Sequence, residues 1–255
     1  MKNLKGKSLC MFSSKGGSGK TTTALNLAGV FSSLNKKVLI IDFDLTSGGI
    51  AIYLNKPFEK TIYNFVDDYA NNRYKNITNY VTKYNDNIDI LPTVKDPRQG
   101  SKIDSSYAEI VIEKSVYEYD IVLIDMTHDL SELNISILDN VDSILCNLTN
   151  DLIDLKNARN LVKIFNDAGF KNYKFILNEY INPNKKYYSL YDIKSIIKAN
   201  IDYLIPGNFY LKSIDNYVAD GKILTLESKM PKIYPKVYKS YLAVCNDLME
   251  AENEK

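Results

Sequence analysis

Residues 8–22 of the chain read SLCMFSSKGGSGKTT, and this stretch decides the fold. The apolar run 8–12 predicts a buried strand, the glycines after it predict a tight turn, and the pattern from Thr21 to about Leu34 predicts a helix. A strand that passes through a glycine-rich turn directly into a helix is the opening unit of many α/β folds. We therefore expect a parallel sheet with crossover helices.

Six further apolar runs support that expectation. VLII and IVLI, at residues 38–41 and 121–124, are apolar without alternation, which is typical of central strands covered on both faces. Helical patterns fill the gaps, and the clearest runs over residues 158–168 and stops at Gly169. The sequence predicts one α/β domain over residues 1–255, with a mainly parallel, doubly wound sheet flanked by helices. The other predicted strands are residues 88–91, 143–148, 175–177 and 203–205.

Two segments between these elements are less regular. Residues 61–84 are rich in tyrosine, asparagine and charge, and they predict one or two peripheral helices. Residues 182–188 contain Pro183 and two lysines, and they predict a mobile surface loop. Neither segment has the composition of a domain linker.

Composition limits the class of function. The 255 residues carry a formal net charge of +1, so any binding to nucleic acid or an anionic membrane must be local. The three cysteines lie singly in apolar runs, which is typical of buried thiols in a reducing compartment. No stretch approaches the roughly 18 apolar residues of a membrane span. We expect a soluble, cytoplasmic protein without a transmembrane segment.

The turn after the first strand has the residues that bind phosphate. Glycines let successive backbone N–H groups point inward, and the start of the next helix adds partial positive charge. Lys20 is placed to reach the β- and γ-phosphates, and Thr21 to bring its hydroxyl to Mg²⁺. The strict pattern GxxxxGK[ST] has a glycine where this chain has Ser14. The predicted nucleotide-binding residues here are Gly16, Gly17, Ser18, Gly19, Lys20, Thr21 and Thr22.

Acidic side chains follow two of the predicted strands. Asp42 and Asp44 end the second strand and point to one side of the extended chain. Asp125 follows four apolar residues, as in a strand that holds Mg²⁺ through water. Because these strand ends lie beside the phosphate loop, the carboxylates suit the handling of metal and water. His128, the only histidine, is interpreted as a structural or surface residue, because a lone histidine cannot form a His-rich metal site.

The segment KGGSGKT matches the deviant Walker A motif KGGxGK[ST], and the chain thereby resembles the ParA/MinD family of P-loop ATPases. The resemblance implies an ATP- and Mg²⁺-dependent switch of the P-loop NTPase fold. It implies that Asp42, Thr21 and Asp125 support Mg²⁺ and that Asp44 positions the attacking water. It also implies a homodimer on ATP binding, with Lys15 crossing to the partner's nucleotide, and slow hydrolysis stimulated by another protein. The implied catalytic residues are Asp44, Lys15 and Lys20.

Two later segments resemble base-recognition elements of that family. FILNEY places Asn178 where family members carry an asparagine that contacts adenine, and YLIPGN resembles the loop that closes over the base, with Pro206 at its centre. One segment departs from the pattern. Family members usually continue from the Walker B aspartate with Thr-Pro-Pro or a similar turn, whereas here Met126, Thr127 and His128 follow Asp125. The conformation of this loop is therefore not predicted.

The resemblance identifies the switch and leaves its cargo open. Residues 77–94 resemble the pilus-positioning branch, CpaE/TadZ, whereas a cluster of lysines near the carboxyl end is a basis for nonspecific DNA binding and DNA partition. Acids among these lysines favour a solvated face slightly. The last helix has an apolar stripe and an acidic end, which predicts docking onto the domain and not onto anionic lipid. The lysines are Lys212, Lys222, Lys229, Lys232, Lys236 and Lys239.

Two alternatives to a hydrolysing switch stay open. A non-hydrolysing scaffold would bind ATP and dimerise, while the altered loop after Asp125 prevents turnover. Bacterial tyrosine kinases share the nucleotide fold, and Tyr187, Tyr188 and Tyr191 would be their kind of substrate. Lys15 and a terminal segment without tyrosine argue against that alternative. The scattered cysteines lack the ligand pattern of iron–sulfur carriers.

Overall fold

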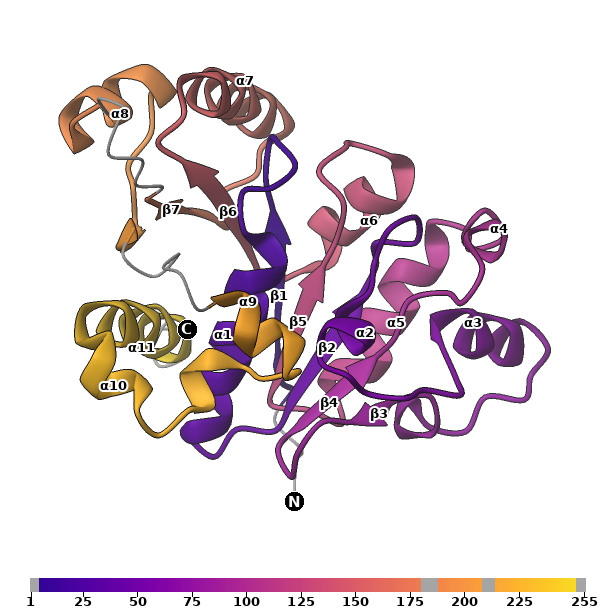
Figure 1. Cartoon of the computed structure of the whole chain (residues 1–255). Coiled ribbons are helices and arrows are strands. Elements are labelled where there is room, and N and C mark those ends of the chain that lie inside the picture. The colour runs from indigo at the N-terminus through magenta and orange to yellow at the C-terminus, as the bar shows by residue number, and fades with distance from the viewer. Residues whose placement is uncertain (1–4, 180–187, 208–213, 251–255) are drawn as a thin grey trace.

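The computed structural model describes residues 5–179, 188–207 and 214–250 of the chain (Figure 1). One sheet of eight strands crosses the molecule in the order β3-β4-β2-β5-β1-β6-β7-β8. Neighbouring strands are parallel, except that β3 is antiparallel to β4. The strands are β1 (Lys7–Phe12), β2 (Val38–Asp42), β3 (Thr82–Lys83), β4 (Ile88–Leu91), β5 (Ile121–Asp125), β6 (Ser143–Thr149), β7 (Tyr173–Asn178) and β8 (Tyr203–Ile205).

Helices cover both faces of the sheet (Figure 1). On one face lie α3 (Ile62–Ala70), α5 (Ser106–Val116), α6 (Glu132–Asn140), α7 (Leu152–Ala168) and α8 (Leu190–Ile197). On the other lie α1 (Lys20–Ser33), α2 (Ile50–Tyr53), α10 (Met230–Ile233) and α11 (Pro235–Glu250). Short elements complete the chain: α4 (Pro97–Gly100), α9 (Ile214–Ala219), and the 3-10 helices η1 (Ile77–Asn79) and η3 (Leu224–Leu226).

Alternation along the strands produces these two apolar layers. Within β2, Leu39 and Ile41 pack with α3 and α5, whereas Val38 and Ile40 pack with α1. Successive side chains of a strand point to opposite faces, so a continuous apolar run fills both layers. The predicted doubly wound, mainly parallel α/β sheet is confirmed, and all seven predicted strands are present.

The structure adds one strand that was not predicted. Residues 61–84 form α3, η1 and then β3, so the predicted peripheral helices are followed by an edge strand. With two residues, β3 is too short for alternation to reveal it. Of the predicted loop at residues 182–188, only Tyr188 lies among the described residues. Gly169 ends α7 in the left-handed conformation, with φ of 81°, as predicted.

The apolar stripe of the last helix is docked, as predicted. Tyr241, Cys245 and Leu248 of α11 are buried in the layer that contains α1. Full burial of one such large side chain stabilises a fold by about 1.5–3 kcal/mol. The stripe therefore has its partner inside the domain. No helix of the described residues is long and apolar enough to cross a membrane.

Candidate functional site

The segment between β1 and α1 forms a tight loop at the carboxyl end of the central strands (Figure 1). Gly17 and Gly19 have φ of 75° and 89°, conformations that a side chain would strain. Gly19 caps α1 without a side-chain hydrogen bond, and no acidic residue lies in the first turn of the helix. The partial positive charge of the helix start is therefore not neutralised by its own side chains. This geometry suits an anion.

Lys20 spans the loop from the first turn of α1. Its Nζ donates to Ser13 Oγ at 3.1 Å, and Ser13 Oγ donates to the carbonyl of Lys15 at 2.7 Å. Burial lowers the pKa of Lys20, and the negative charges of Asp125 and Asp44 partly offset that effect. The ammonium group has thus lost part of its hydration and is bonded to a neutral hydroxyl. A phosphate would replace that lost stabilisation.

Thr21 and Asp125 meet at the start of α1. Thr21 Oγ1 donates to Asp125 Oδ2 at 2.5 Å, while Asp125 Oδ1 is buried and has no hydrogen-bond partner. Burial raises the pKa of Asp125 to about 6, against the opposing effects of the Thr21 hydrogen bond and the Lys20 charge. A hydroxyl beside an unsatisfied carboxylate oxygen is a ligand set that Mg²⁺ accepts. The two predicted metal ligands therefore fit the ion.

Asp42 is paired with Asp125 in the register of β2 and β5, but its carboxylate is turned to its own loop. Its oxygens accept hydrogen bonds from the backbone N–H groups of Asp44 at 3.3 Å and Ile50 at 3.0 Å. Burial raises its pKa to about 8, and the charges of Asp125 and Asp44 add to the shift. A methyl group on Gly48 would lie 2.3 Å from Asp42 Oδ1, so only glycine lets the loop close there. Asp42 anchors the loop; its part in metal binding stays a prediction.

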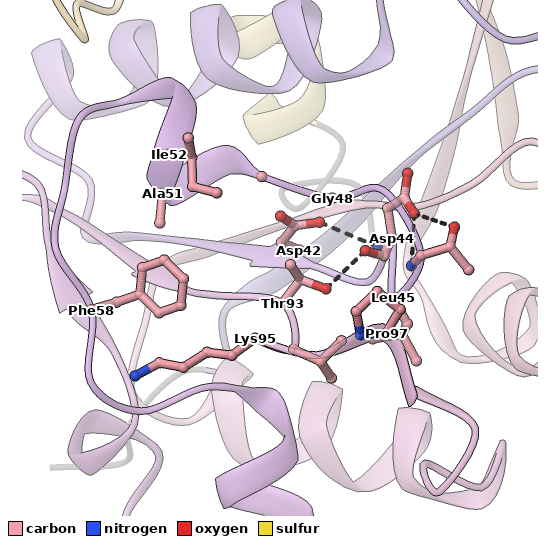
Figure 2. Close-up of a pocket in the computed structure, with 13 residues that line it drawn as sticks. Asp42, Asp44, Leu45, Gly48, Ala51, Ile52, Phe58, Thr93, Lys95 and Pro97 are labelled. Atoms are coloured by element: carbon pink, nitrogen blue, oxygen red, sulfur yellow. Dashed lines mark hydrogen bonds between the residues drawn. The ribbon is translucent and has the colours of Figure 1, made fainter. Parts of the chain in front are cut away.

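Asp44 is held in that loop by its neighbours (Figure 2). It accepts hydrogen bonds from the backbone and hydroxyl of both Thr46 and Ser47, at 2.8–3.1 Å. Burial alone would raise the pKa of Asp44, but these hydrogen bonds outweigh it and the pKa is lowered. The carboxylate is therefore ionised at neutral pH. Asp42 and Asp44 line one side of a cavity of about 250 Å³, with Phe58 and Lys95 farther along it.

Lys15 and His128 lie at the outer side of the phosphate loop. The side chain of Lys15 is 44% exposed, and its Nζ is 3.9 Å from Asp151 Oδ1 at the start of α7. A methyl group on Gly16 would lie 3.7 Å from His128 Cε1, so the exposed imidazole borders the loop. The loop that carries His128 is fixed by the buried Asn134, whose amide donates to Thr127 Oγ1 and to the Asp129 carbonyl.

The two predicted base-recognition residues lie at the ends of β7 and β8. Asn178 is 1% exposed, and its amide donates to the Ser18 carbonyl at 2.8 Å. Its Oδ1 is buried without a partner. Pro206 follows β8, where the next backbone N–H, of Gly207, donates to Glu179 at 3.2 Å. The structure thus shows Asn178 supporting the phosphate loop, and adenine contacts of both residues stay predictions.

Sequence reasoning missed one buried acid at this site. Asp154, in the first turn of α7, is fully buried and accepts a hydrogen bond from Ser14 Oγ at 3.1 Å. The departure of Ser14 from the strict motif was a signal that this position is special. Nothing in the pattern of α7 separates Asp154 from a solvated helix residue, so its partner could not be found from the sequence.

Known proteins share sequence and fold with this chain. A family model described as an AAA domain (AAA_31) matches residues 6–175. The chromosome-partitioning ATPase Soj of Thermus thermophilus is 29% identical over 140 residues, which are 54% of this chain and 53% of Soj. The chain spans 62% of an ATP-binding protein of Methanocaldococcus jannaschii, at 28% identity over 167 residues, and 53% of Soj.

Solved structures share the fold over nearly the whole chain. A ParA family ATPase from Chlorobium tepidum has a TM-score of 0.79 at 18% identity, over 94% of this chain and 98% of that one. The septum site-determining protein MinD from Pyrococcus horikoshii, complexed with Mg-ADP, has a TM-score of 0.76 at 21% identity, over 95% of both chains. With a family model that matches more than half of its residues, the chain belongs to the AAA domain family, among the ParA/MinD P-loop ATPases.

Proposed function

We propose that this chain binds ATP with Mg²⁺, hydrolyses it slowly, and uses the cycle to switch between a monomer and a homodimer that positions a cellular cargo. The observation that carries the proposal is the pair of Thr21 and Asp125, with its unsatisfied buried oxygen, at the start of the helix that follows the phosphate loop. This pair fits Mg²⁺ on nucleotide phosphates. The MinD of Pyrococcus horikoshii was solved with Mg-ADP.

Each residue of the site has one task in this proposal. Mg²⁺, held by Thr21 and Asp125, would neutralise charge on the phosphates. The partly desolvated Lys20 binds the β- and γ-phosphates. Asp44, kept ionised by its hydrogen bonds, orients the water that attacks the γ-phosphorus while ADP leaves. Phosphoryl transfer needs this positioning and charge neutralisation more than covalent chemistry by the protein.

Exposed apolar side chains around the site support dimerisation. Ile52 after β2 is 69% exposed, Leu130 after β5 is 40% exposed, and Ile153 after β6 is 66% exposed. All three follow the carboxyl ends of parallel strands, where Lys15 also lies. A face with apolar side chains around a half-exposed lysine can bury against a second copy. ATP would complete that face by supplying the anion that Lys15 of the other copy contacts.

The cargo has two candidates, and one surface favours DNA. Lys229, Lys232, Lys236 and Lys239 are all exposed along α10 and α11, whereas Lys222 is paired with Asp220 at 2.8 Å. Lys212 lies outside the described residues. Four exposed lysines on neighbouring helices suit a phosphate backbone. DNA partition is therefore our first candidate, and a protein cargo such as a pilus apparatus is the second. In either case we propose a cytoplasmic protein that is recruited to the nucleoid or to the cell pole.

Sedimentation of the purified chain tests the proposal. The chain is run with ADP or ATP plus Mg²⁺, then with nonspecific duplex DNA at low and moderate salt, while phosphate release is measured in parallel. A DNA-partition switch is supported if the chain dimerises with ATP but not with ADP, releases phosphate slowly and captures DNA in a salt-sensitive way. An ATP-dependent dimer that does not bind DNA favours a protein cargo. An ATP-dependent dimer that releases no phosphate favours the non-hydrolysing scaffold. No response to ATP would overturn the proposal.

Two controls sharpen the result. Replacing Lys229, Lys232, Lys236 and Lys239 together by Ala should abolish DNA capture and leave the ATP-dependent dimer. Mass spectrometry after incubation with ATP tests the kinase alternative, because Tyr191 is 82% exposed. Phosphate on Tyr188 or Tyr191 would support a kinase and contradict the switch.

A further inference from the structure

Ser14 stands where the strict phosphate-loop pattern has glycine, and its side chain makes a hydrogen bond that glycine could not make. Its hydroxyl donates to Asp154 Oδ1 at 3.1 Å, across 140 positions of sequence. Glycine at this place would have no side chain and could not make the contact. The departure from the pattern therefore coincides with a hydrogen bond between the loop and α7.

Asp154 is itself rigidly held. Its side chain is fully buried, and its Oδ2 accepts hydrogen bonds from the backbone N–H of Thr149 at 2.7 Å and from Thr149 Oγ1 at 2.8 Å. Thr149 ends β6, so one oxygen of the carboxylate fastens the first turn of α7 to the sheet. The other oxygen reaches Ser14. A role in starting the helix explains the Thr149 contacts and leaves the Ser14 contact unexplained.

The position of the carboxylate relates it to the nucleotide site. Ser14 directly precedes Lys15, and the negative charge of Asp154 counteracts part of the effect of burial on the pKa of Lys20. A buried charge of this kind is costly unless its hydrogen bonds are complete, and removing one partner leaves it unsatisfied. A loop conformation that keeps the Ser14 hydroxyl beside Asp154 therefore stabilises the buried carboxylate.

We infer that Ser14 and Asp154 are positioning residues, through which the first turn of α7 fixes the conformation of the phosphate loop for nucleotide binding. The inference rests on the proposed function, because it concerns the same nucleotide. It means that the affinity for nucleotide depends on a helix that supplies none of the predicted phosphate ligands.

The test compares two single variants that each remove one hydrogen bond from the same carboxylate. Ser14→Ala removes the bond to the loop, and Thr149→Val removes one bond to the sheet. Binding of MgADP and MgATP is measured by titration calorimetry, and stability by urea unfolding. We expect Ser14→Ala to weaken both nucleotides about tenfold, the loss expected for one hydrogen bond to a charged group. Thr149→Val should lower the unfolding midpoint while keeping the affinity within about twofold of wild type.

Ser14→Thr keeps the hydroxyl and should recover most of the affinity. Wild-type affinity in Ser14→Ala would overturn the inference, and so would equal losses of affinity in Ser14→Ala and Thr149→Val, since Asp154 would then act only through the start of α7. If the wild-type chain binds neither nucleotide, the proposed function fails, which is a different result from a tight wild-type complex that Ser14→Ala leaves unchanged.

Discussion

Asp44 carries the proposed positioning of water, and its surroundings make the assignment testable. We expect Asp44→Ala to reduce phosphate release by about 100-fold or more, in the range found when a positioned acid–base group is removed. Nucleotide binding should persist, so the variant should accumulate as an ATP-bound dimer in sedimentation. Ser47→Ala is the matched control, because it removes one hydrogen bond to the carboxylate at 2.8 Å and leaves the carboxylate in place. Normal hydrolysis by Asp44→Ala would show that another residue orients the water.

Asp125 predicts a pH dependence of stability when metal is withheld. Its folded pKa of about 6 lies above the ordinary value, so the folded state binds more protons than the unfolded chain between roughly pH 4 and 6. The contribution of Asp125 to the free energy of unfolding is therefore greatest below about pH 4, and it is lost as the pH rises through 6. Asp125→Asn should remove the share of this slope that belongs to Asp125, while the share of Asp42, whose pKa is raised to about 8, remains. In EDTA at pH 8 the variant should exceed wild type by on the order of 2 kcal/mol in urea unfolding.

Two comparisons check that expectation. Asp139→Asn, at an exposed position of α6, should keep the wild-type slope. Added Mg²⁺ should stabilise the wild-type chain at pH 8 and leave Asp125→Asn unchanged, because the ligand is gone. A slope between pH 4 and 6 that is the same in Asp125→Asn and in wild type would contradict the raised pKa of Asp125, because Asp42, with its pKa of about 8, would then account for the whole slope.

At this scale the sequence predicted the residues that local pattern determines. Lys20, Thr21 and Asp125 follow from a strand, a glycine turn and a strand end, and the structure brings them together. The contact between Ser14 and Asp154 depends on how α7 packs against the phosphate loop, which no local pattern encodes. The hydrogen bonds by which Asp42 holds the Asp44 loop could not be predicted either, because they depend on the path that the loop takes after β2.

Among the elements, α1 depends on one glycine for its packing. A methyl group on Gly29 would lie 2.2 Å from Thr225 Oγ1 and 2.8 Å from Ile223 Cγ2, where η3 crosses the helix. Gly29→Ala should destabilise the chain by about 1–3 kcal/mol through overpacking, although alanine favours helix by about 1 kcal/mol. Ser33→Ala, at an exposed position of the same helix, provides the control in urea unfolding. Equal or greater stability of Gly29→Ala would show that η3 moves aside freely.

The elements themselves were predictable in proportion to their length and burial. The strands β2 and β5, apolar throughout and covered on both faces, have a strong local signal. Residues 214–250 were harder, because η3, α9 and α10 are too short for a clear local pattern. The place of η3 is set by packing on α1, and that of α10 by packing on α11 and η3. The stripe on α11 predicted burial correctly, since its Tyr241, Cys245 and Leu248 are buried against the domain; Val237 and Val244, which the stripe did not include, are buried as well.

For the whole molecule, Lys15 predicts how two copies assemble. Lys15→Ala should bind nucleotide nearly as well as wild type and form at least about tenfold less dimer with ATP in light scattering, because it lacks the cross-interface contact to phosphate that we propose. Folding stability should change by less than about 1 kcal/mol, since the ion pair with Asp151 is half-exposed. Lys171→Ala, exposed at the opposite end of β7, is the control. Undiminished dimerisation of Lys15→Ala would refute the cross-interface role.

The two-residue strand β3 also limits how copies can join. Thr82 and Lys83 pair antiparallel with β4 and end the sheet there, so this border offers a new strand very little free backbone. The lysine adds a charge that an incoming strand would have to desolvate. Growth of the sheet from chain to chain, the route to fibrous aggregates, is therefore blocked on this side. The homodimer that we propose can therefore form repeatedly without stacking into filaments at that border.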